Sequence, residues 1–235
     1  MLILFTGKGG VGKSTMAATT AVYHAKQGKN TILVSSDPAH STDDVILQKV
    51  GFSPTKIEEN LWAMNINAEK QAKEFLERTN EGMKSLTANI PGFDSEILSD
   101  MAGFPGMEEY FGMEMIYNLM NDTSYDVIVF DTAPTGHTLK MLTAPDTIRA
   151  FILRVLRMKA KIENIKGFIF RKKSETAKIV KELEDICERI EIFKKLLRED
   201  DCSINLVSIP SEAGYQECAR TIKFLNTIQL PIKHI

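Results

Sequence analysis

Residues Leu2–Thr15, with the sequence LILFTGKGGVGKST, decide the fold of this chain. Leu2–Thr6 is a short apolar run, which is typical of a buried parallel strand. Glycines follow it, and then Lys13–Gln27 has helical character and ends at Gly28, a residue type that commonly terminates helices. We therefore expect a strand, a glycine-rich loop and a helix in direct succession.

The loop in this stretch matches the phosphate-binding pattern G-x-x-x-x-G-K-[ST] at every fixed position. Glycines let successive backbone N–H groups converge on phosphates without Cβ clashes, and the helix N-terminus adds partial positive charge. Lys13 is expected to reach the β- and γ-phosphates of a nucleotide, and the Ser14 hydroxyl to coordinate Mg²⁺. The residues predicted to bind the nucleotide here are Gly7, Lys8, Gly9, Gly10, Val11, Gly12, Lys13, Ser14 and Thr15.

Three further apolar runs predict strands, at Thr31–Ser35, Asp126–Phe130 and Ser203–Ile209. Helical stretches separate them, which indicates an α/β fold with a doubly wound, mostly parallel sheet. The polar groups of interest follow strand ends, where open α/β sheets bind their ligands. The predicted fold class is therefore that of the P-loop NTPases.

The chain of 235 residues fits one P-loop domain spanning residues 1–235, with an added helical region at roughly 68–122 and 145–200. The clearest helical period lies in Thr176–Glu199, with a loop before it at Gly167–Lys173. Its apolar positions share one helical face: Ile179, Val180, Leu183, Ile186, Ile190, Phe193 and Leu197. Leu230–Ile235 has the character of a strand that has just begun, so we expect a C-terminal portion to follow.

Bulk composition excludes several classes of protein. The formal net charge of -2 predicts no global attraction to nucleic acid or to an anionic membrane. No apolar run approaches the ~20 residues of a membrane span, and no basic segment precedes the first apolar run as in a signal peptide. Cys187, Cys202 and Cys218 are widely spaced, against a disulfide framework or a local zinc site. We expect a cytoplasmic protein without a nucleic-acid partner.

Two aspartates follow predicted strands. Asp37 comes just after Thr31–Ser35, and Asp131 directly follows Asp126–Phe130. An aspartate after such a run is the Walker-B arrangement, which holds Mg²⁺ directly or through water. A helix N-cap is the alternative for both, and the Asp-Pro pair at Asp37 also favours a turn.

The predicted metal ligands are thus Ser14, Asp37 and Asp131, for Mg²⁺. His40 and His137 lie within the same two segments. Two separated histidines do not complete a metal site, so we favour structural hydrogen bonds for them.

The motifs GKGGVGKST, DPAHS and DTAPTGHTL, in this order and spacing, resemble those of the ArsA family. That family holds the arsenite-pump ATPase and the ATPase that targets tail-anchored membrane proteins, and the similarity in organisation runs from Met1 to Ile235. The resemblance implies hydrolysis of Mg-ATP. It also places Asp37 in switch I, where it positions or activates the attacking water, and Asp131 at the start of switch II, near the Mg²⁺ shell.

The loop itself resembles the deviant Walker A loop, whose early lysine reaches across a dimer interface to the partner's nucleotide. By this resemblance Lys8 stabilises charge on the transferred phosphoryl group, as an arginine finger does, with an effect of roughly 10³–10⁵ in rate. A solvated surface lysine is the alternative. The implied catalytic residues are Lys8, Lys13, Asp37 and Asp131, and the implied assembly is a homodimer.

The segment Pro210–Thr221 is similar to a family segment near the nucleotide base, which adds Pro210 and Glu212 to the expected cofactor-binding residues. The adenine specificity itself depends on the resemblance.

Within the family, this sequence is closest to the tail-anchored-protein targeting branch. Eight of the 11 methionines lie between Met83 and Met158, and methionine suits surfaces that accept varied apolar partners. We expect a groove for a hydrophobic transmembrane segment, delivered to a receptor at the membrane; an ordinary methionine-rich core is the alternative. The branch commonly carries a CxxC zinc pair, which is absent here, so zinc stays open.

Three other activities remain as alternatives. An iron–sulfur carrier resembling nitrogenase iron protein would need cysteines after the switch segments, and none lies between Asp37 and Cys187. A metalloid-transport ATPase would need thiolate ligands, and Ala102–Glu108 has no cysteine where that branch places one. A partitioning or positioning ATPase of the MinD and ParA kind shares the loop, but no C-terminal amphipathic tail is visible.

Overall fold

The structure is a computed structural model that describes residues 1–36, 41–75, 77, 107–132, 173–230 and 232–235. It divides into two compact units. The first consists of Met1–Asn67, Gly112–Lys140 and Phe193–Ile235, and the second of Ala68–Phe111 and Met141–Ile192. The predicted helical stretch at 145–166 lies outside the described residues, as does Asp37.

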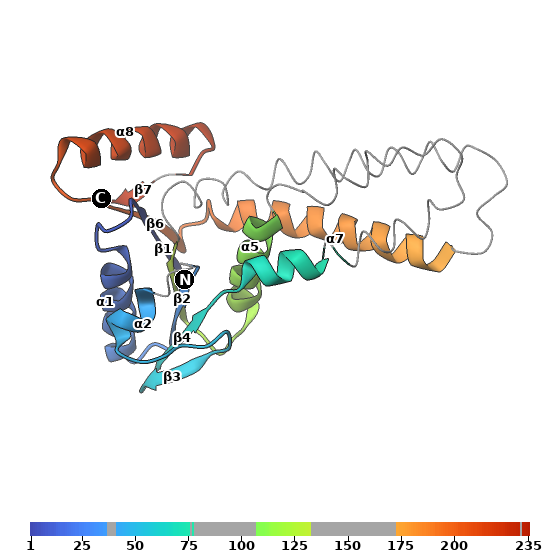
Figure 1. The fold of residues 1–235 in the computed structure, drawn as a ribbon, viewed down its shortest axis with the longest axis horizontal. Helices are drawn as coiled ribbons and strands as arrows, with labels where there is room; N and C mark the ends of the chain where they lie inside the picture. Colours follow the sequence, from blue (N-terminus) through green and yellow to red (C-terminus); the bar gives the residue numbers. More distant parts are fainter. Residues whose placement is uncertain (37–40, 76, 78–106, 133–172, 231) are drawn as a thin grey trace. The chain divides into compact units, whose positions relative to one another are not determined.

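A seven-stranded sheet forms the centre of the first unit in the described part of the chain (Figure 1). Its strands are β1 (Leu2–Gly7), β2 (Thr31–Ser35), β3 (Thr55–Glu58), β4 (Leu61–Asn65), β5 (Val127–Asp131), β6 (Cys202–Val207) and β7 (Ile232–His234). They lie in the order β3-β4-β2-β5-β1-β6-β7, and every neighbouring pair is parallel except β3 and β4. The predicted mostly parallel α/β sheet is confirmed.

The described helices are α1 (Lys13–Lys26), α2 (Ser41–Ile46), α5 (Met107–Asn121), α7 (Lys173–Leu196) and α8 (Glu212–Thr227). Residues 68–75 are also helical. None of these helices combines the length and apolar composition of a membrane span.

The four strands predicted from apolar runs correspond to β1, β2, β5 and β6, with ends shifted by at most two residues. Strands β3 and β4 were not predicted. Strand β3 alternates half-buried and exposed residues at the edge of the sheet, while β4 (LWAMN) contains no β-branched residue. Asn60, with φ 57°, makes the tight turn between them.

Helix α7 confirms the helix predicted from Thr176–Glu199. The second half of its predicted apolar face is buried: Ile186, Ile190, Phe193 and Leu197 are at most 4% exposed. The side chains of the first half, and most of the preceding predicted loop, lie outside the described residues.

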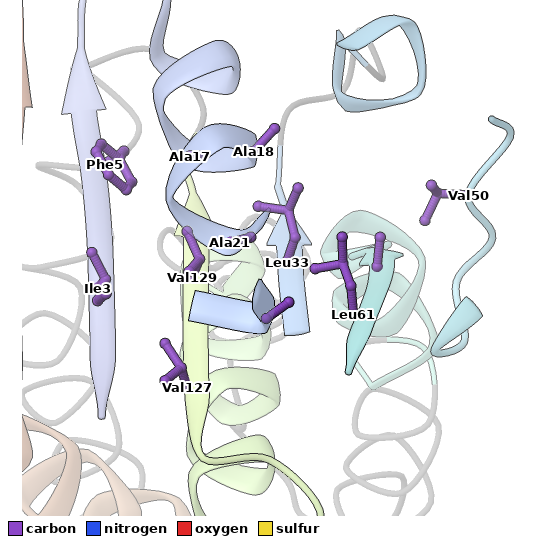
Figure 2. Packing of buried hydrophobic residues seen from close by; sticks show 12 residues of the cluster. Ile3, Phe5, Ala17, Ala18, Ala21, Leu33, Val50, Leu61, Val127 and Val129 are labelled. Carbon is purple, nitrogen blue, oxygen red and sulfur yellow. The ribbon is translucent and has the colours of Figure 1, made fainter. Parts of the chain in front are cut away.

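Helix α1 packs closely on one face of the sheet because the side that it turns to the strands is made of alanines. Ala17, Ala18, Ala21 and Ala25 are at most 7% exposed. Figure 2 shows three of them beside strand residues such as Phe5 and Val129, which belong to the same buried cluster. Small side chains let the helix axis approach the sheet, and this holds the start of α1 at the end of β1.

We predict that Ala17→Leu lowers the free energy of unfolding by about 1–3 kcal/mol, because the added atoms have no space between helix and sheet. Ala17 is 0% exposed. Lys26→Leu, at an exposed position of the same helix, is the matched control and should change stability by no more than about 0.5 kcal/mol. Urea denaturation of both variants measures the difference, and equal effects would contradict the packing described here.

Candidate nucleotide site

The candidate site begins where β1 ends. Strand β1 lies between β5 and β6, and the connection from β1 leads towards β2 on one side while that from β6 leads to β7 on the other. Connections that leave neighbouring strands in opposite directions open a crevice at the carboxyl ends, where such sheets bind ligands. The predicted phosphate-binding loop, Gly7–Ser14, lies at this point.

Glycine is required at several positions of the loop for backbone reasons. Gly10 and Gly12 have φ angles of 78° and 95°, which residues with a Cβ adopt rarely. Gly7 has φ 155°, and a Cβ there would lie 2.1 Å from the carbonyl oxygen of Val207 on β6. A Cβ on Gly9, Gly10 or Gly12 would meet nothing within 4 Å, so the loop is open at these three positions.

Helix α1 starts without a side-chain cap. Gly12 occupies the N-cap position in a left-handed conformation and makes no side-chain hydrogen bond, and the first turn contains no acidic residue. The positive end of the helix dipole is therefore not neutralised by the helix's own side chains. This arrangement, together with the open loop, is suited to binding an anion such as a phosphate.

Lys13 is folded back onto the loop. Its Nζ donates a hydrogen bond to the backbone oxygen of Lys8 at 3.0 Å, and the residue is only 8% exposed. Burying an ammonium group without hydrogen-bond or charge partners costs free energy. This position therefore favours an anionic ligand that would supply further partners. Lys8 itself is exposed.

Asp131 lies at the end of β5, next to β1, and is 0% exposed. Its Oδ2 accepts a hydrogen bond of 3.3 Å from Thr42 Oγ1 on α2. Its backbone oxygen accepts a bond of 3.1 Å from the N–H of Ser36, which follows β2. The next residue, Thr132, donates through its hydroxyl to the Phe5 carbonyl at 2.7 Å. The ends of β1, β2 and β5 are thus joined around this carboxylate.

Helix α2 is held to the sheet at a second point. Asn65, at the end of β4 and 2% exposed, donates through Nδ2 to Asp43 Oδ1 at 3.3 Å and to the Val50 carbonyl at 2.9 Å. Thr42 and Asp43 directly follow the segment that contains Asp37. The two contacts therefore fix the chain just after that segment to β5 and β4.

The oxygen donors at this edge of the sheet fit Mg²⁺. The Asp131 carboxylate and the Ser14 hydroxyl are hard ligands, and Mg²⁺ in nucleotide enzymes typically takes one or two such groups together with phosphate oxygens and water. Among the described residues, no group of three or more His, Cys, Asp or Glu side chains could hold a metal ion by itself.

Pro210 and Glu212 follow β6, whose last residue Val207 pairs with Gly7, so they lie along the chain just beyond the strand beside the loop. Both are exposed. Glu212 begins α8, a helix that was not predicted, and Ser211 caps it by accepting a hydrogen bond from the N–H of Gly214 at 3.1 Å.

Sequence reasoning missed the polar residues that hold the site together: Thr42, Asn65, Thr132 and Asn205. Asn205, on β6, donates through Nδ2 to the Leu4 carbonyl at 3.2 Å and is 9% exposed. Each of these side chains bonds a residue distant in sequence, so local patterns carry no direct sign of it. The indication that the sequence does offer is a polar residue within or just after an apolar strand. A polar side chain that is buried at such a position requires a hydrogen-bond partner.

The model of the anion-transporting ATPases, called ArsA ATPase, matches residues 1–235. The chain belongs to the ArsA family of ATPases. The resemblance found in the three sequence motifs is therefore confirmed.

Individual relatives of this ArsA-family chain are about equally similar to it. ATPase ARSA1 of Chlamydomonas reinhardtii is 31% identical over 99% of this chain and 34% of its own length. A protein named as an arsenical pump-driving ATPase, from Prosthecochloris vibrioformis, is 31% identical over 96% and 57%. ATPase GET3B of Arabidopsis thaliana is 31% identical over 97% and 61%. This chain thus spans 34% to 61% of the length of these relatives.

We predict that Thr42→Val in this ArsA-family chain lowers the free energy of unfolding by about 1–3 kcal/mol, because the buried Asp131 carboxylate loses one of its hydrogen bonds. Thr42→Ser keeps the hydroxyl and is the matched control. Chemical denaturation should therefore rank stability as wild type, then Ser, then Val. A valine variant at least as stable as the serine variant would contradict the role given to this contact.

Proposed function

We propose that this chain binds Mg-ATP at the loop after β1 and hydrolyses it as a homodimer. The observation that carries the proposal is the open glycine loop, with Lys13 held against it and an uncapped helix behind it. Backbone N–H groups and one ammonium then face a polyphosphate from the same side. Membership of an ATPase family supports ATP as the nucleotide.

In this site, Lys13 exchanges its bond to the Lys8 carbonyl for phosphate oxygens and neutralises their charge. Ser14 and Asp131 hold Mg²⁺, whose chemistry here is to neutralise and orient the β- and γ-phosphates. Thr42 keeps the Asp131 carboxylate in position through its hydroxyl. Asp37, in the segment between β2 and α2, orients or activates the attacking water. Pro210 and Glu212, after β6, contact the nucleotide near its base.

Lys8 has a different role from Lys13. It is exposed at the surface of the loop, whereas Lys13 is buried. An exposed cation beside the phosphates is free to enter the site of a second protomer, and there it stabilises charge on the transferred phosphoryl group. Hydrolysis in this proposal therefore requires a dimer.

Mixing two inactive variants tests this arrangement. Lys8→Ala and Asp37→Asn should each bind Mg-ATP but hydrolyse it at least about 10³-fold more slowly than wild type. In a mixed dimer, one site has an intact Asp37 of its own and an intact Lys8 from the partner. An equal mixture should therefore recover about a quarter of wild-type turnover, since half of the dimers are mixed and each has one complete site.

Phosphate release measured before and after mixing gives the result. Lys13→Ala mixed with Asp37→Asn is the control and should show no recovery, because one site of that mixed dimer lacks the main phosphate contact and the other lacks Asp37. No recovery from Lys8→Ala plus Asp37→Asn would refute action of Lys8 across the dimer, and wild-type turnover by Asp37→Asn alone would refute the role of the aspartate.

We further propose that the hydrolysis cycle controls capture and release of a hydrophobic transmembrane segment, as in the tail-anchored-protein targeting branch, with delivery from the cytoplasm to a membrane receptor. The names of the relatives do not decide between the targeting branch and the arsenite-pump branch, since one is called GET3B and another an arsenical pump-driving ATPase. The methionines between Met83 and Met158 and the missing cysteines support the targeting branch. Zinc stays open.

Aromatic side chains contact one another in the described part of the second unit. Phe75 and Phe111 meet edge to face with centroids 5.7 Å apart, and Tyr110 and Phe111 do so at 5.2 Å. Met113 is 2% exposed and belongs to the core, so it is not available to a client. Met83, Met101, Met141 and Met158 lie outside the described residues, and the proposed client surface draws on them.

The arsenite-driven alternative requires clustered thiolates. Cys187, Cys202 and Cys218 form no disulfide, and in the described residues they join no group of potential metal ligands. Burial raises the pKa of the Cys202 thiol to about 12, so it is protonated at neutral pH and a poor ligand for a soft metalloid. These observations weigh against binding of a metalloid. They do not weigh against binding of an apolar client.

A fluorescent transmembrane peptide tests the client proposal. We predict that the dimer binds it at least several-fold more tightly with Mg-ATP than without nucleotide, because nucleotide-driven closure favours the conformation that binds the client. A scrambled peptide with added lysines is the control. Peptide affinity that does not change with nucleotide would contradict the proposed coupling, and ATP turnover stimulated by arsenite would favour the alternative.

A further inference from the structure

Asn65 is a buried polar residue that bonds the chain on both sides of α2. It ends β4 and is 2% exposed. Its Nδ2 donates to Asp43 Oδ1, in the first turn of α2, at 3.3 Å and to the Val50 carbonyl, beyond the helix, at 2.9 Å. Its backbone N–H donates to the Gly51 carbonyl at 2.8 Å. One residue of the sheet thus holds the segment that contains α2 at two places.

The orientation of this side-chain amide is fixed by its surroundings. Both of its hydrogen bonds go to oxygen atoms, so the amide nitrogen has to face Asp43 and Val50. Oδ1 is buried and has no hydrogen-bond partner within the described part of the chain. A buried oxygen without a partner costs free energy, and an apolar side chain of the same size would fill the space without that cost. The amide is therefore explained by the two groups that its nitrogen holds.

Helix α2 needs such support because it is short. It has 6 residues, and helices of fewer than about 12 residues are marginal by themselves. Ile46, its last residue, packs against the apolar cluster. The first turn is held by hydrogen bonds, from Thr42 to Asp131 and from Asn65 to Asp43. The Thr42 bond is 3.3 Å long, beyond the range of about 2.5–3.0 Å that is usual for O–H···O bonds, so it is weak without further support.

The register of the sheet places the two anchors of α2 at the same level. Asn65 pairs with Ser35 of β2, and Ser35 pairs with Asp131 of β5. Paired residues of parallel strands point to the same face, so Asn65 and Asp131 share one face, two strand spacings or about 10 Å apart. Thr42 and Asp43 are consecutive, and each bonds one of these anchors. The first turn of α2 therefore bridges β5 and β4, and loss of one bond leaves it held from one side.

We propose that Asn65 is a positioning residue for the Mg²⁺ site: by holding α2 through Asp43, it keeps the Thr42 hydroxyl on the Asp131 carboxylate. The inference rests on the proposed function, in which Asp131 holds Mg²⁺. This ion requires near-ideal octahedral geometry, so a carboxylate that turns away binds it less well. Groups that orient a metal ligand are typically worth roughly 10–100-fold in metal affinity. Asn65 acts through Thr42, which places its effect at the lower end.

A double-mutant cycle without nucleotide tests the link between the two bonds. Asp43→Ala removes the acceptor for Asn65, and Thr42→Val removes the donor to Asp131. If the first bond supports the second, Thr42→Val should destabilise the Asp43→Ala protein less than it destabilises the wild type in urea. Asp44→Ala, at an exposed position of the same turn, is the matched control and should combine additively with Thr42→Val. Additive effects of Asp43→Ala and Thr42→Val would overturn the link.

The effect on the metal is measured as the ratio of the dissociation constants of ATP without and with Mg²⁺. Asn65→Leu and Asp43→Ala should each lower this ratio roughly tenfold, whereas the affinity for metal-free ATP, which depends on the loop and Lys13, should not change. Asp43→Asn should retain more of the ratio than Asp43→Ala, because its amide oxygen still accepts the bond from Asn65. Asp44→Ala should retain all of it. Asp43 is half-buried, so its variants keep the test decisive if Asn65→Leu does not fold.

A general structural role of Asn65 predicts a different result, an equal loss of affinity for ATP with and without Mg²⁺. That result would overturn the positioning role, as would an unchanged ratio in both Asn65→Leu and Asp43→Ala or a wild-type affinity that does not depend on Mg²⁺. Failure of the wild type to bind ATP at all would instead refute the proposed function. The cycle in urea would then still decide whether Asn65 supports the Thr42–Asp131 bond.

Discussion

The position of β1 inside the sheet, between β5 and β6, is the constraint on which the rest of this structure depends. β1 pairs with β5 and β6 along its length, and these ladders place Phe5 opposite Asp131 and Gly7 opposite Val207. The loop that follows Gly7 therefore starts between a buried carboxylate and the connection to α8. Because a side chain at Gly7 would collide with the Val207 carbonyl, only glycine lets the two strands stay paired to this point.

Hydrogen bonds between distant residues then turn this edge of the sheet into a rigid support. Thr132 bonds the Phe5 carbonyl, Ser36 bonds the Asp131 carbonyl, and Asn205 bonds the Leu4 carbonyl. All these groups are buried or half-buried, where an unmade bond costs about 1–3 kcal/mol. Such a support keeps the loop, the carboxylate and α2 at defined positions, which is what the proposed phosphoryl transfer by positioning and electrostatics requires.

Most of the central fold could be predicted from sequence because the signals were local. An apolar run, glycines and a helix identified β1, the loop and α1, and the aspartate after a second run identified the end of β5. Strands β3 and β4 escaped prediction because one is a half-polar edge strand and the other lacks β-branched residues. The contacts of Thr42 and Asn65 could not be predicted, because they join residues 89 and 22 positions apart and depend on the order of strands in the sheet.

The proposed function depends on the binding of a polyphosphate by the glycine loop and Lys13. Titration calorimetry of the folded protein with ATP, in the presence of Mg²⁺, tests this most directly. We predict saturable heat with one nucleotide per chain, and much weaker binding when adenosine replaces ATP, since the phosphates supply most of the contacts. No measurable uptake at millimolar ATP, or equal affinity for adenosine, would contradict it.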